Sequence, residues 1–251
     1  MFQLIDVKYI VKDLIKNRNL KYWLIRLGNK FDKNYIFVDK TICPEVITKD
    51  GNIFLLTPEI VSINQVHNDY IFNDIQKDDI VIDIGANIGG FCIPASKFSQ
   101  NVYAIEPIMV PELRHNIQRN NANVHIIENA LGDGSITEVT WNGVKKTIQS
   151  CTFNQIKKIT GGCDFLKCDC EGFEWFIQPD DLKKIRRIEM EIHNYNPSPY
   201  DPGLLLEAIQ SDFNVVVKTN SAGQNKDVMP KLHYKKYPAI DEVEIFHAYR
   251  K

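Results

Sequence analysis

The sequence lacks any long apolar run. No stretch of it approaches the roughly 20 apolar residues that a transmembrane helix needs. The first residues, MFQLID, also lack the basic region, the apolar core and the small-residue cleavage site of a signal peptide. We therefore expect neither a membrane-spanning helix nor a secretory leader.

An excess of one charge is missing as well. The chain has 30 Lys and Arg residues against 32 Asp and Glu residues, which gives a net charge of −2. A balance this even creates no general field for nucleic acid or for an anionic membrane, although it does not exclude a local basic patch. Nucleic acid and membrane are therefore not the partners that we expect.

Paired cysteine motifs are also absent. The six cysteines form no C-x-x-C pair and fall in segments with strand or helix patterns; they are Cys43, Cys92, Cys151, Cys163, Cys168 and Cys170. A chain of 251 residues buries a sizeable core without staples, so we interpret them as reduced core thiols and expect a cytoplasmic protein. A zinc site is the alternative, but only one residue separates Cys168 from Cys170, and no second pair has zinc-ligand spacing.

The composition is that of an ordinary globular protein, with 44% hydrophobic and 25% charged residues. Apolar residues between Leu4 and Ile15 recur at helical spacing and predict an amphipathic helix, and 21–27 adds a second short one. Segments 35–38 and 53–56 are β-like, with a hairpin-type turn at 49–52. We expect residues 1–64 to form a mixed α+β extension or cap, followed by a main domain over 65–251.

From residue 78 onward, strands and helices alternate. The candidate strands are 80–84, 102–105, 124–127, 165–168 and 188–192, with helical stretches such as 110–121 between them. This alternation predicts a doubly wound parallel α/β sheet. Only a polar stretch separates 215–217 from 243–246, so we expect that last pair to be antiparallel. Pro94 falls inside the first helix after the sheet begins and should kink or shorten it.

A glycine-bearing turn follows the first of these strands. The segment DIGANIGG runs from Asp83 to Gly90 and links a strand to a helix. Gly85 allows a tight turn, Gly89 allows close approach of a ligand, and the free N–H groups of the helix start would face that ligand. Glu106 ends the next strand, where a carboxylate accepts hydrogen bonds from both hydroxyls of a ribose.

The turn does not fit a dinucleotide. Asn87 stands where the G-x-G-x-x-G fingerprint has its middle glycine, and Asp83 lies just before the turn. An anionic side chain there suits a ligand with a cationic part better than a pyrophosphate. S-adenosyl-L-methionine carries a sulfonium and an ammonium, so the charges favour it as cofactor. NAD and a glycine turn with no ligand are the alternatives.

Four segments together resemble the FkbM family of S-adenosylmethionine-dependent methyltransferases. They are DIGANIG from Asp83, YAIEP from Tyr103, DFLKCDCEG from Asp164 to Gly172, and EMEIH from Glu189 to His193. The last two are much more specific than the first, which most class I methyltransferases share. The resemblance covers residues 65–250, and Cys170 departs from it because an apolar residue is usual there.

The resemblance implies the seven-stranded class I methyltransferase sheet, Rossmann-like, with an antiparallel last strand. It also implies methyl transfer from S-adenosylmethionine, usually to an oxygen of a sugar or natural product. In such a sheet the ligand crevice lies between strands one and four, and adenine lies after strand three, although Asn129 is as well explained by a turn. The cofactor-binding residues that we predict are Asp83, Gly85, Ala86, Asn87, Gly89, Glu106, Pro107, Asn129, Ala130 and Asp169.

Charged residues also lie on the fourth and fifth strands, where apolar ones are usual. We expect Lys167 to form an ion pair with Glu189 or Glu191. Asp169, Glu171 and His193 fall at the carboxyl ends of these strands, where the crevice of an open α/β sheet lies. A helix cap is the alternative for the two carboxylates, and a buried core histidine is the alternative for His193.

Transfer to an alcohol benefits from a base that removes its proton. His193 is the first candidate because the unperturbed imidazole pKa is near neutrality, and Glu171 and Asp169 are the second. Asp169 and Asn194 superficially resemble the divalent-metal sites of some O-methyltransferases. His193 stands where a second carboxylate would help, so we assign no metal ligand.

The stretch from Thr219 to Glu242 combines basic and aromatic residues, which could hold a sugar, an anionic acceptor or RNA. A solvated hairpin loop is the alternative. The sequence thus predicts an O-methyltransferase whose acceptor is a small molecule or glycan. The competing functions are an RNA methyltransferase and an inactive cofactor-binding or scaffold protein.

Overall fold

The computed structural model describes residues 35–37, 45–57, 59–141, 144–193, 195–219, 225–226 and 244–251. The contacts between its Cα atoms divide the chain into two compact units, Met1–Asn64 and Gln65–Lys251. The helices expected at 4–15 and 21–27 lie outside the described residues, as does most of the 219–242 stretch. No helix within the described ranges is long and apolar enough to cross a membrane.

The first unit contains a small antiparallel sheet. Its strands are β1 (Tyr35–Phe37), β2 (Glu45–Thr48) and β3 (Ile53–Leu55), in the order β1-β2-β3. The predicted turn at 49–52 joins β2 to β3, and Gly51 in it has φ +83°. The sequence did not predict β2. Helix α3 (Ile60–Asp69) follows.

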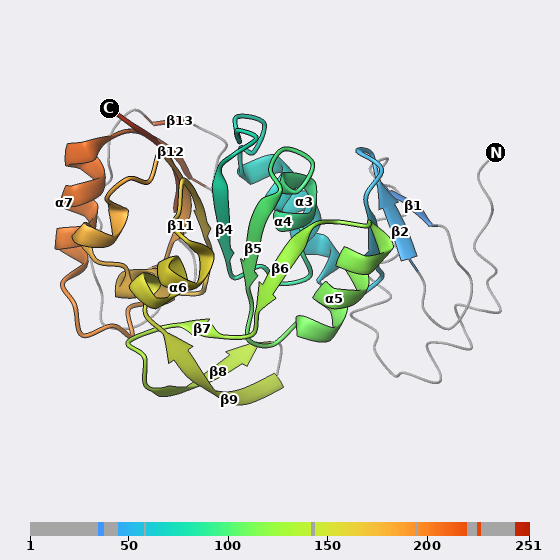
Figure 1. The fold of residues 1–251 in the computed structure, drawn as a ribbon, viewed down its shortest axis with the longest axis horizontal. Helices are drawn as coiled ribbons and strands as arrows, with labels where there is room; N and C mark the ends of the chain where they lie inside the picture. The colour runs from blue at the N-terminus through green and yellow to red at the C-terminus, as the bar shows by residue number, and fades with distance from the viewer. Residues whose placement is uncertain are drawn as a thin grey trace. The chain divides into compact units, whose positions relative to one another are not determined.

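The second unit is built on one mixed sheet (Figure 1). Its order is β13-β12-β14-β11-β10-β4-β5-β6, formed by β4 (Ile80–Ile84), β5 (Asn101–Ile105), β6 (Val124–Ile127), β10 (Phe165–Cys168), β11 (Arg187–Ile192), β12 (Phe213–Thr219), β13 (Asn225–Lys226) and β14 (Glu244–Arg250). The five neighbouring strands β11, β10, β4, β5 and β6 are parallel to one another. Strand β14 is antiparallel to both β11 and β12.

This strand order is that of a class I methyltransferase, as predicted. The chain leaves β4 toward β6 and then returns to β10 on the other side of β4, so β4 and β10 flank the topological switch point. The antiparallel pairing of β12 with β14 confirms the expectation for the last two long strands. In an open α/β sheet of this kind, ligands bind outside the carboxyl ends of the strands at the switch point.

The helices are short. They are α4 (Cys92–Ala95), α5 (Val110–Arg119), α6 (Phe153–Thr160) and α7 (Pro202–Asp212), with 3-10 turns η1 (Phe173–Phe176) and η2 (Pro179–Leu182). The four residues of α4 include Pro94, which confirms that this proline shortens the first helix. Thr152 and Gln155 form a capping box that starts α6, and Gly161 at φ +84° ends it.

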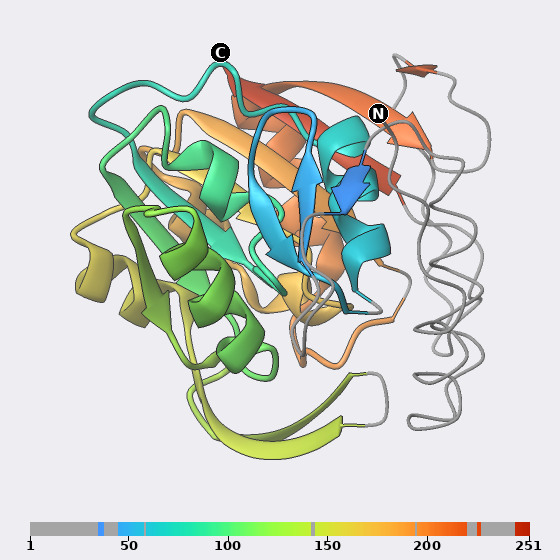
Figure 2. The same ribbon diagram turned by 90° about the vertical axis from the view of Figure 1, so that its right-hand side faces the viewer.

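A hairpin that the sequence did not predict lies between β6 and α6. Its strands are β8 (Ile136–Trp141) and β9 (Val144–Cys151), and β9 also pairs with β7 (Ala130–Leu131). Figure 2 shows β8 and β9 as a curved ribbon that extends away from the main sheet. The hydrophobic alternation of β8 is weak, because Val139 is the one buried side chain among residues 136–140 of this strand.

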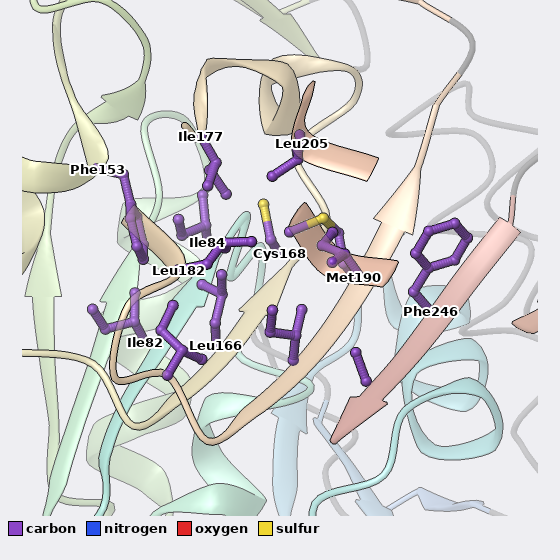
Figure 3. Close-up of a cluster of buried hydrophobic side chains, with 14 of the residues drawn as sticks. Ile82, Ile84, Phe153, Leu166, Cys168, Ile177, Leu182, Met190, Leu205 and Phe246 are labelled. Atoms are coloured by element: carbon purple, nitrogen blue, oxygen red, sulfur yellow. The ribbon is translucent and has the colours of Figure 1, made fainter. Parts of the chain in front are cut away.

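The two faces of the main sheet differ in character. One face is apolar: Ile82, Ile84, Leu166, Cys168 and Met190 pack against side chains of α6, η1, η2 and α7 (Figure 3). Because side chains alternate along a strand, the intervening residues point to the other face. Those intervening residues include the charged side chains of β4, β10 and β11, so the opposite face of the same strands carries the candidate site.

Candidate functional site

A row of four buried charged or titratable residues crosses the sheet. Asp83, Lys167, Glu189 and His247 are aligned partners on β4, β10, β11 and β14. Lys167 is 2% exposed, His247 is 6% exposed, and both carboxylates are fully buried. Burying charges is costly unless each is paired. We call these four residues the charged row.

Lys167 pairs with a different partner from the one expected. Its Nζ lies 3.1 Å from Asp83 Oδ1 and 3.9 Å from Asp169 Oδ2, and it donates to Gly85 O at 3.0 Å. The prediction that it pairs with Glu189 or Glu191 was wrong, because Lys167 has an acid on both sides in register and Glu189 is committed elsewhere. Burial alone would lower the pKa of Lys167, but Asp83 and Asp169 raise it, so the ammonium stays charged.

Glu189 belongs to a second ion-pair group in the same row. It pairs with Arg187, its Oε2 lies 2.7 Å from His247 Nδ1, and the Ile71 N–H donates to Oε2 at 3.0 Å. Arg187 is fully buried and also meets Asp74 Oδ2 at 2.9 Å. Each carboxylate of the charged row therefore has a cation at ion-pair distance, Lys167 for Asp83 and Arg187 for Glu189, and no ligand is needed to balance its charge.

The turn after β4 is packed tightly against the loop after β10. Gly85 has φ +75°, and a Cβ there would lie 1.7 Å from Asp169 O, so no side chain fits. The Gly85 and Ala86 N–H groups donate to Ile105 O at 3.0 and 3.2 Å. Gly85 thus joins the loops that follow β4, β5 and β10 at one point.

Gly89 packs closely against α4 and α5, and its approach to a ligand stays a prediction. At φ +96°, a Cβ on it would lie 2.7 Å from Ile93 Cδ1 and 3.0 Å from Leu113 Cδ1, so its small size serves packing against α4 and α5. The expected helix N-terminus is also missing from the turn, because residues 87–91 are turns and α4 starts at Cys92. Pro94 and the short α4 explain this difference.

Asp83 and Asn87, the two polar side chains near this turn, differ in whether they have partners. Asp83 is fully buried and paired with Lys167, so it does not face a ligand as a free anion. Burial raises its pKa, and Lys167 opposes that rise. Asn87, at φ +49°, has a buried side-chain Oδ1 with no hydrogen-bond partner among the described residues. An orphaned acceptor in a turn is the kind of atom that a donor on a ligand would satisfy.

Glu106 already holds three backbone groups. Its Oε2 accepts from Asn87 N at 2.8 Å, and its Oε1 accepts from Ile108 N and Met109 N at 2.7 and 2.9 Å. It therefore fixes the glycine turn and the two residues that precede α5. A carboxylate has about four lone-pair sites, so these three bonds leave about one acceptor position for a ribose hydroxyl.

The structure also shows the contacts of Pro107, Asn129 and Ala130, three predicted cofactor-binding residues in the loops after β5 and β6. The Asn129 amide donates to Cys151 Sγ at 2.7 Å, which favours the turn role, and Ala130 is buried in β7 opposite Ser150. Pro107 O accepts from Lys146 Nζ of the hairpin at 2.8 Å. These residues follow β5 and β6 at the carboxyl edge of the sheet, on the same edge as the glycine turn.

A tyrosine that the sequence analysis did not single out links two acids at the ends of β10 and β11. The hydroxyl of Tyr70 lies 3.0 Å from Asp169 Oδ2 and 2.8 Å from Glu191 Oε2. One hydroxyl has one proton to donate, so the second contact requires a proton on a carboxyl group. Burial, then the charge of Asp169, raises the pKa of Glu191 to about 8, which makes Glu191 the protonated partner at neutral pH.

His193 is held from one side and open on the other. Buried Glu174 Oε1 lies 3.0 Å from His193 Nδ1 and accepts from its backbone N–H at 2.7 Å. Nε2 faces Glu171 Oε2 at 3.6 Å and Glu191 Oε1 at 3.8 Å. Burial alone would lower the pKa of His193, but Glu174, Asp169 and Glu171 raise it to about 10, so the imidazole carries a proton at neutral pH.

The structure brings Asp169, Glu171 and His193 together, as the sequence analysis expected. Asp169 lies in contact with the glycine turn through Gly85, and burial raises the pKa of Glu171. Glu171 is 56% exposed and has φ +57°, an unusual conformation for a residue other than glycine. Glu174 and Tyr70 were missed because each sits outside the strands, where alternation gives no signal.

Replacing Tyr70 with phenylalanine tests the link between the two acids. We expect the free energy of unfolding to fall by on the order of 1–3 kcal/mol, because Asp169 and Glu191 lose their shared buried partner. Urea denaturation measures this. Tyr103→Phe is the control, since its hydroxyl bonds to none of the described residues, and it should change stability little. Equal effects of the two variants would contradict the role of Tyr70.

The cysteines do not form a metal site in the described part of the chain. Cys92, Cys151, Cys163, Cys168 and Cys170 are free thiols there. Cys43 lies outside the described residues. Instead, Asp169, Glu191 and His193 form a group in which one ligand atom from each lies within 4.8 Å of the others.

Solved structures with a similar fold include three enzymes at low identity. The precorrin 8W decarboxylase of Methanobacterium thermoautotrophicum is 16% identical, with 75% of this chain and 89% of that chain covered at a TM-score of 0.42. An rRNA methylase from Streptococcus thermophilus is 10% identical, with 76% and 95% covered at 0.42. The tRNA (uracil-54, C5)-methyltransferase of Pyrococcus abyssi, in complex with S-adenosyl-L-homocysteine, is 13% identical, with 86% and 44% covered at 0.37.

No family model matches the chain, and no curated protein matches its sequence. The comparisons therefore do not support the resemblance to the FkbM family. The class I methyltransferase fold stands on the strand order and on the switch point between β4 and β10.

Proposed function

We propose that the protein is an S-adenosylmethionine-dependent methyltransferase that acts on a hydroxyl of a sugar or small natural product. The observation that carries this proposal is the junction at the switch point, by which we mean the close packing of Gly85, in the turn after β4, against the backbone of Asp169, which follows β10. This junction lies where open α/β sheets bind ligands. The FkbM family and the cytoplasm as compartment stay predictions.

The residues of the turn suit the proposed cofactor in part. Asn87 offers a buried Oδ1 that has no hydrogen-bond partner among the described residues. Glu106, whose Oε2 accepts from Asn87 N at 2.8 Å, keeps about one acceptor position for a ribose hydroxyl. Gly85, Ala86 and Pro107 supply backbone around them, with Asn129 and Ala130 on the adenine side. Asp83 acts indirectly, because its pairing with Lys167 fixes the turn through the bond from Lys167 to Gly85 O.

S-adenosylmethionine, when bound, supplies the methyl group on a sulfonium. Transfer forms a C–O bond and breaks the S–C bond, whose electron pair stays on sulfur, and the hydroxyl proton passes to a base. The main contribution of the protein is alignment, which supplies several kcal/mol. Asp169 and His193 position the acceptor beside the glycine turn.

Glu171 is the base that we assign. Its side chain is 56% exposed, so a proton that it accepts can pass on to water. His193, the first candidate from sequence, holds a proton at neutral pH in this arrangement. Glu171→Gln should therefore lower kcat by about 10²-fold or more while KM changes little. His193→Ala should mainly raise KM for the acceptor.

A label-transfer screen tests the proposed function. Protein and S-adenosylmethionine with a labelled methyl group are incubated with saccharides, small alcohols and RNA, and the label in each acceptor is measured. We expect label on a hydroxyl of a saccharide or small alcohol, and no label in the Gly85→Ala variant. Transfer to RNA alone would replace the proposed acceptor, and binding without any transfer would favour an inactive scaffold.

A further inference from the structure

The group formed by Asp169, Glu191 and His193 has features that the methyl donor does not require. One ligand atom from each residue lies within 4.8 Å of the other two. The side chains are 23%, 8% and 11% exposed, so the point that they face is largely shielded from water. Two carboxylates and one imidazole converging on one point make a donor set for a metal ion.

Two polar atoms of this group, Glu191 Oε1 and His193 Nε2, make no hydrogen bond within the described part of the chain. Glu191 Oε1 lies 3.8 Å from His193 Nε2, which is too far for a hydrogen bond. His193 Nε2 likewise has only carboxylate oxygens at 3.6 and 3.8 Å, beyond hydrogen-bond distance. Both atoms can therefore serve as ligand atoms for an ion at their common point.

The other polar atoms of the same side chains are held from outside. Glu174, fully buried, holds His193 Nδ1 at 3.0 Å and so turns Nε2 toward the two acids. Tyr70 holds the Oε2 atom of Glu191 and the Oδ2 atom of Asp169. Metal-binding histidines almost always donate the other ring N–H to an outer carboxylate, backbone carbonyl or water, and binding carboxylates are likewise hydrogen-bonded from outside.

We propose that Asp169, Glu191 and His193 bind one divalent transition-metal ion, with Glu174 and Tyr70 as positioning residues. The imidazole favours an ion such as Mn²⁺ or Zn²⁺ over Mg²⁺, which prefers oxygen ligands. This reverses our expectation from sequence that no metal is bound. Glu191 was considered there only as a partner of Lys167, because its role becomes visible only once β11 ends beside β10.

The ion lies next to the proposed methyl-transfer site. The backbone of Asp169 packs against Gly85, so an ion bound by the Asp169 side chain would lie beside the glycine turn. A hydroxyl bound to a divalent cation loses its proton more easily, and Glu171 lies beside His193 to receive that proton. This role in catalysis rests on the proposed function, whereas binding of the ion does not.

Titration with Mn²⁺ alone tests the proposal. Calorimetry and the electron paramagnetic resonance signal of free Mn²⁺ are measured at mildly alkaline pH, where the ligands lose protons more readily. We expect one saturable site per chain, with affinity lowered at least tenfold in each of Asp169→Asn, Glu191→Gln and His193→Ala. Glu174→Gln should weaken binding by about 10–100-fold through the histidine that it holds.

Matched controls and a folding check keep the test decisive. His125→Ala and Glu138→Gln remove an exposed histidine and an exposed carboxylate, and both should bind Mn²⁺ as the unmodified chain does. Circular dichroism checks that each variant is folded. If another ligand variant unfolds, the Mn²⁺ affinity of the near-isosteric Glu191→Gln variant decides the test. Absence of saturable binding, unchanged binding in the three ligand variants, or tighter binding of Mg²⁺ than of Mn²⁺ would overturn the proposal.

The result is separable from the proposed function. If the protein binds S-adenosylhomocysteine but not Mn²⁺, only the metal site is wrong. If it binds Mn²⁺ at these residues but no S-adenosylhomocysteine, the metal site stands and the methyltransferase proposal fails.

Discussion

Replacing Lys167 with methionine should lower the free energy of unfolding by about 3–5 kcal/mol, the usual cost of removing one partner of a buried ion pair. The reason is Asp83, which is fully buried and has Lys167 Nζ as its charged partner at 3.1 Å. Gly85 O also loses the donor that holds it at 3.0 Å. Urea denaturation of the unmodified chain and the variant measures the change.

The double variant Asp83→Asn/Lys167→Met separates charge from packing. It should recover much of the loss, because no unpaired charge is left in the sheet. Lys183→Met is the control for losing a lysine ion pair, since Lys183 and Asp180 are 73% and 87% exposed and such pairs contribute little. A Lys167→Met variant as stable as the Lys183→Met variant would contradict the charged row as a structural element.

The pH dependence of the Lys167→Met variant follows from the same pair. Burial already raises the pKa of Asp83, and loss of Lys167 removes the interaction that opposes this rise. A folded-state pKa above the unfolded one means that the folded variant binds the proton more tightly, so its stability falls as pH rises through that pKa. The deficit relative to the unmodified chain should therefore shrink as pH is lowered toward the acid range.

Replacing Gly85 with alanine should have the second large effect. A Cβ would lie 1.7 Å from Asp169 O, which is backbone and cannot rotate away. The φ of +75° costs roughly 1–2 kcal/mol for a residue with a side chain, and forced displacement adds about 1–3 kcal/mol. We expect lower stability by about 2–5 kcal/mol and affinity for S-adenosylhomocysteine at least about tenfold weaker, since the two loops must separate.

Gly161→Ala is the matched control for this variant. Gly161 has φ +84°, close to that of Gly85, but a Cβ there would meet nothing within 4 Å. It isolates the backbone cost, which we expect to be about 1 kcal/mol, with cofactor affinity unchanged. If Gly85→Ala behaved like Gly161→Ala in both measurements, the junction between the β4 and β10 loops would not be what shapes the site.

The sheet could be predicted from sequence because its strands obey local rules. Segments 80–84, 124–127 and 165–168 match β4, β6 and β10, since each is a short apolar run bounded by turn residues. Pro94 correctly indicated a short α4, because its effect is local. The β8–β9 hairpin was missed, since its side chains are mostly exposed and carry no clear alternation.

The partners of the buried charges could not be predicted in the same way. Alternation placed Lys167 and Glu189 on one face, but Lys167 has aligned acids on both neighbouring strands. The choice of Asp83 depends on Arg187 and His247 occupying Glu189, and that is a tertiary fact. The same holds for Tyr70, which lies far in sequence from the two acids that it joins.

Calorimetric titration with S-adenosylhomocysteine tests the central claim most directly. If the turn after β4, held by Gly85 and Glu106, binds the adenosyl cofactor, the chain should take up one equivalent, and the Gly85→Ala variant should bind at least about tenfold more weakly while Gly161→Ala binds normally. No heat of binding in the unmodified, folded chain, or equal binding by all three proteins, would contradict the account.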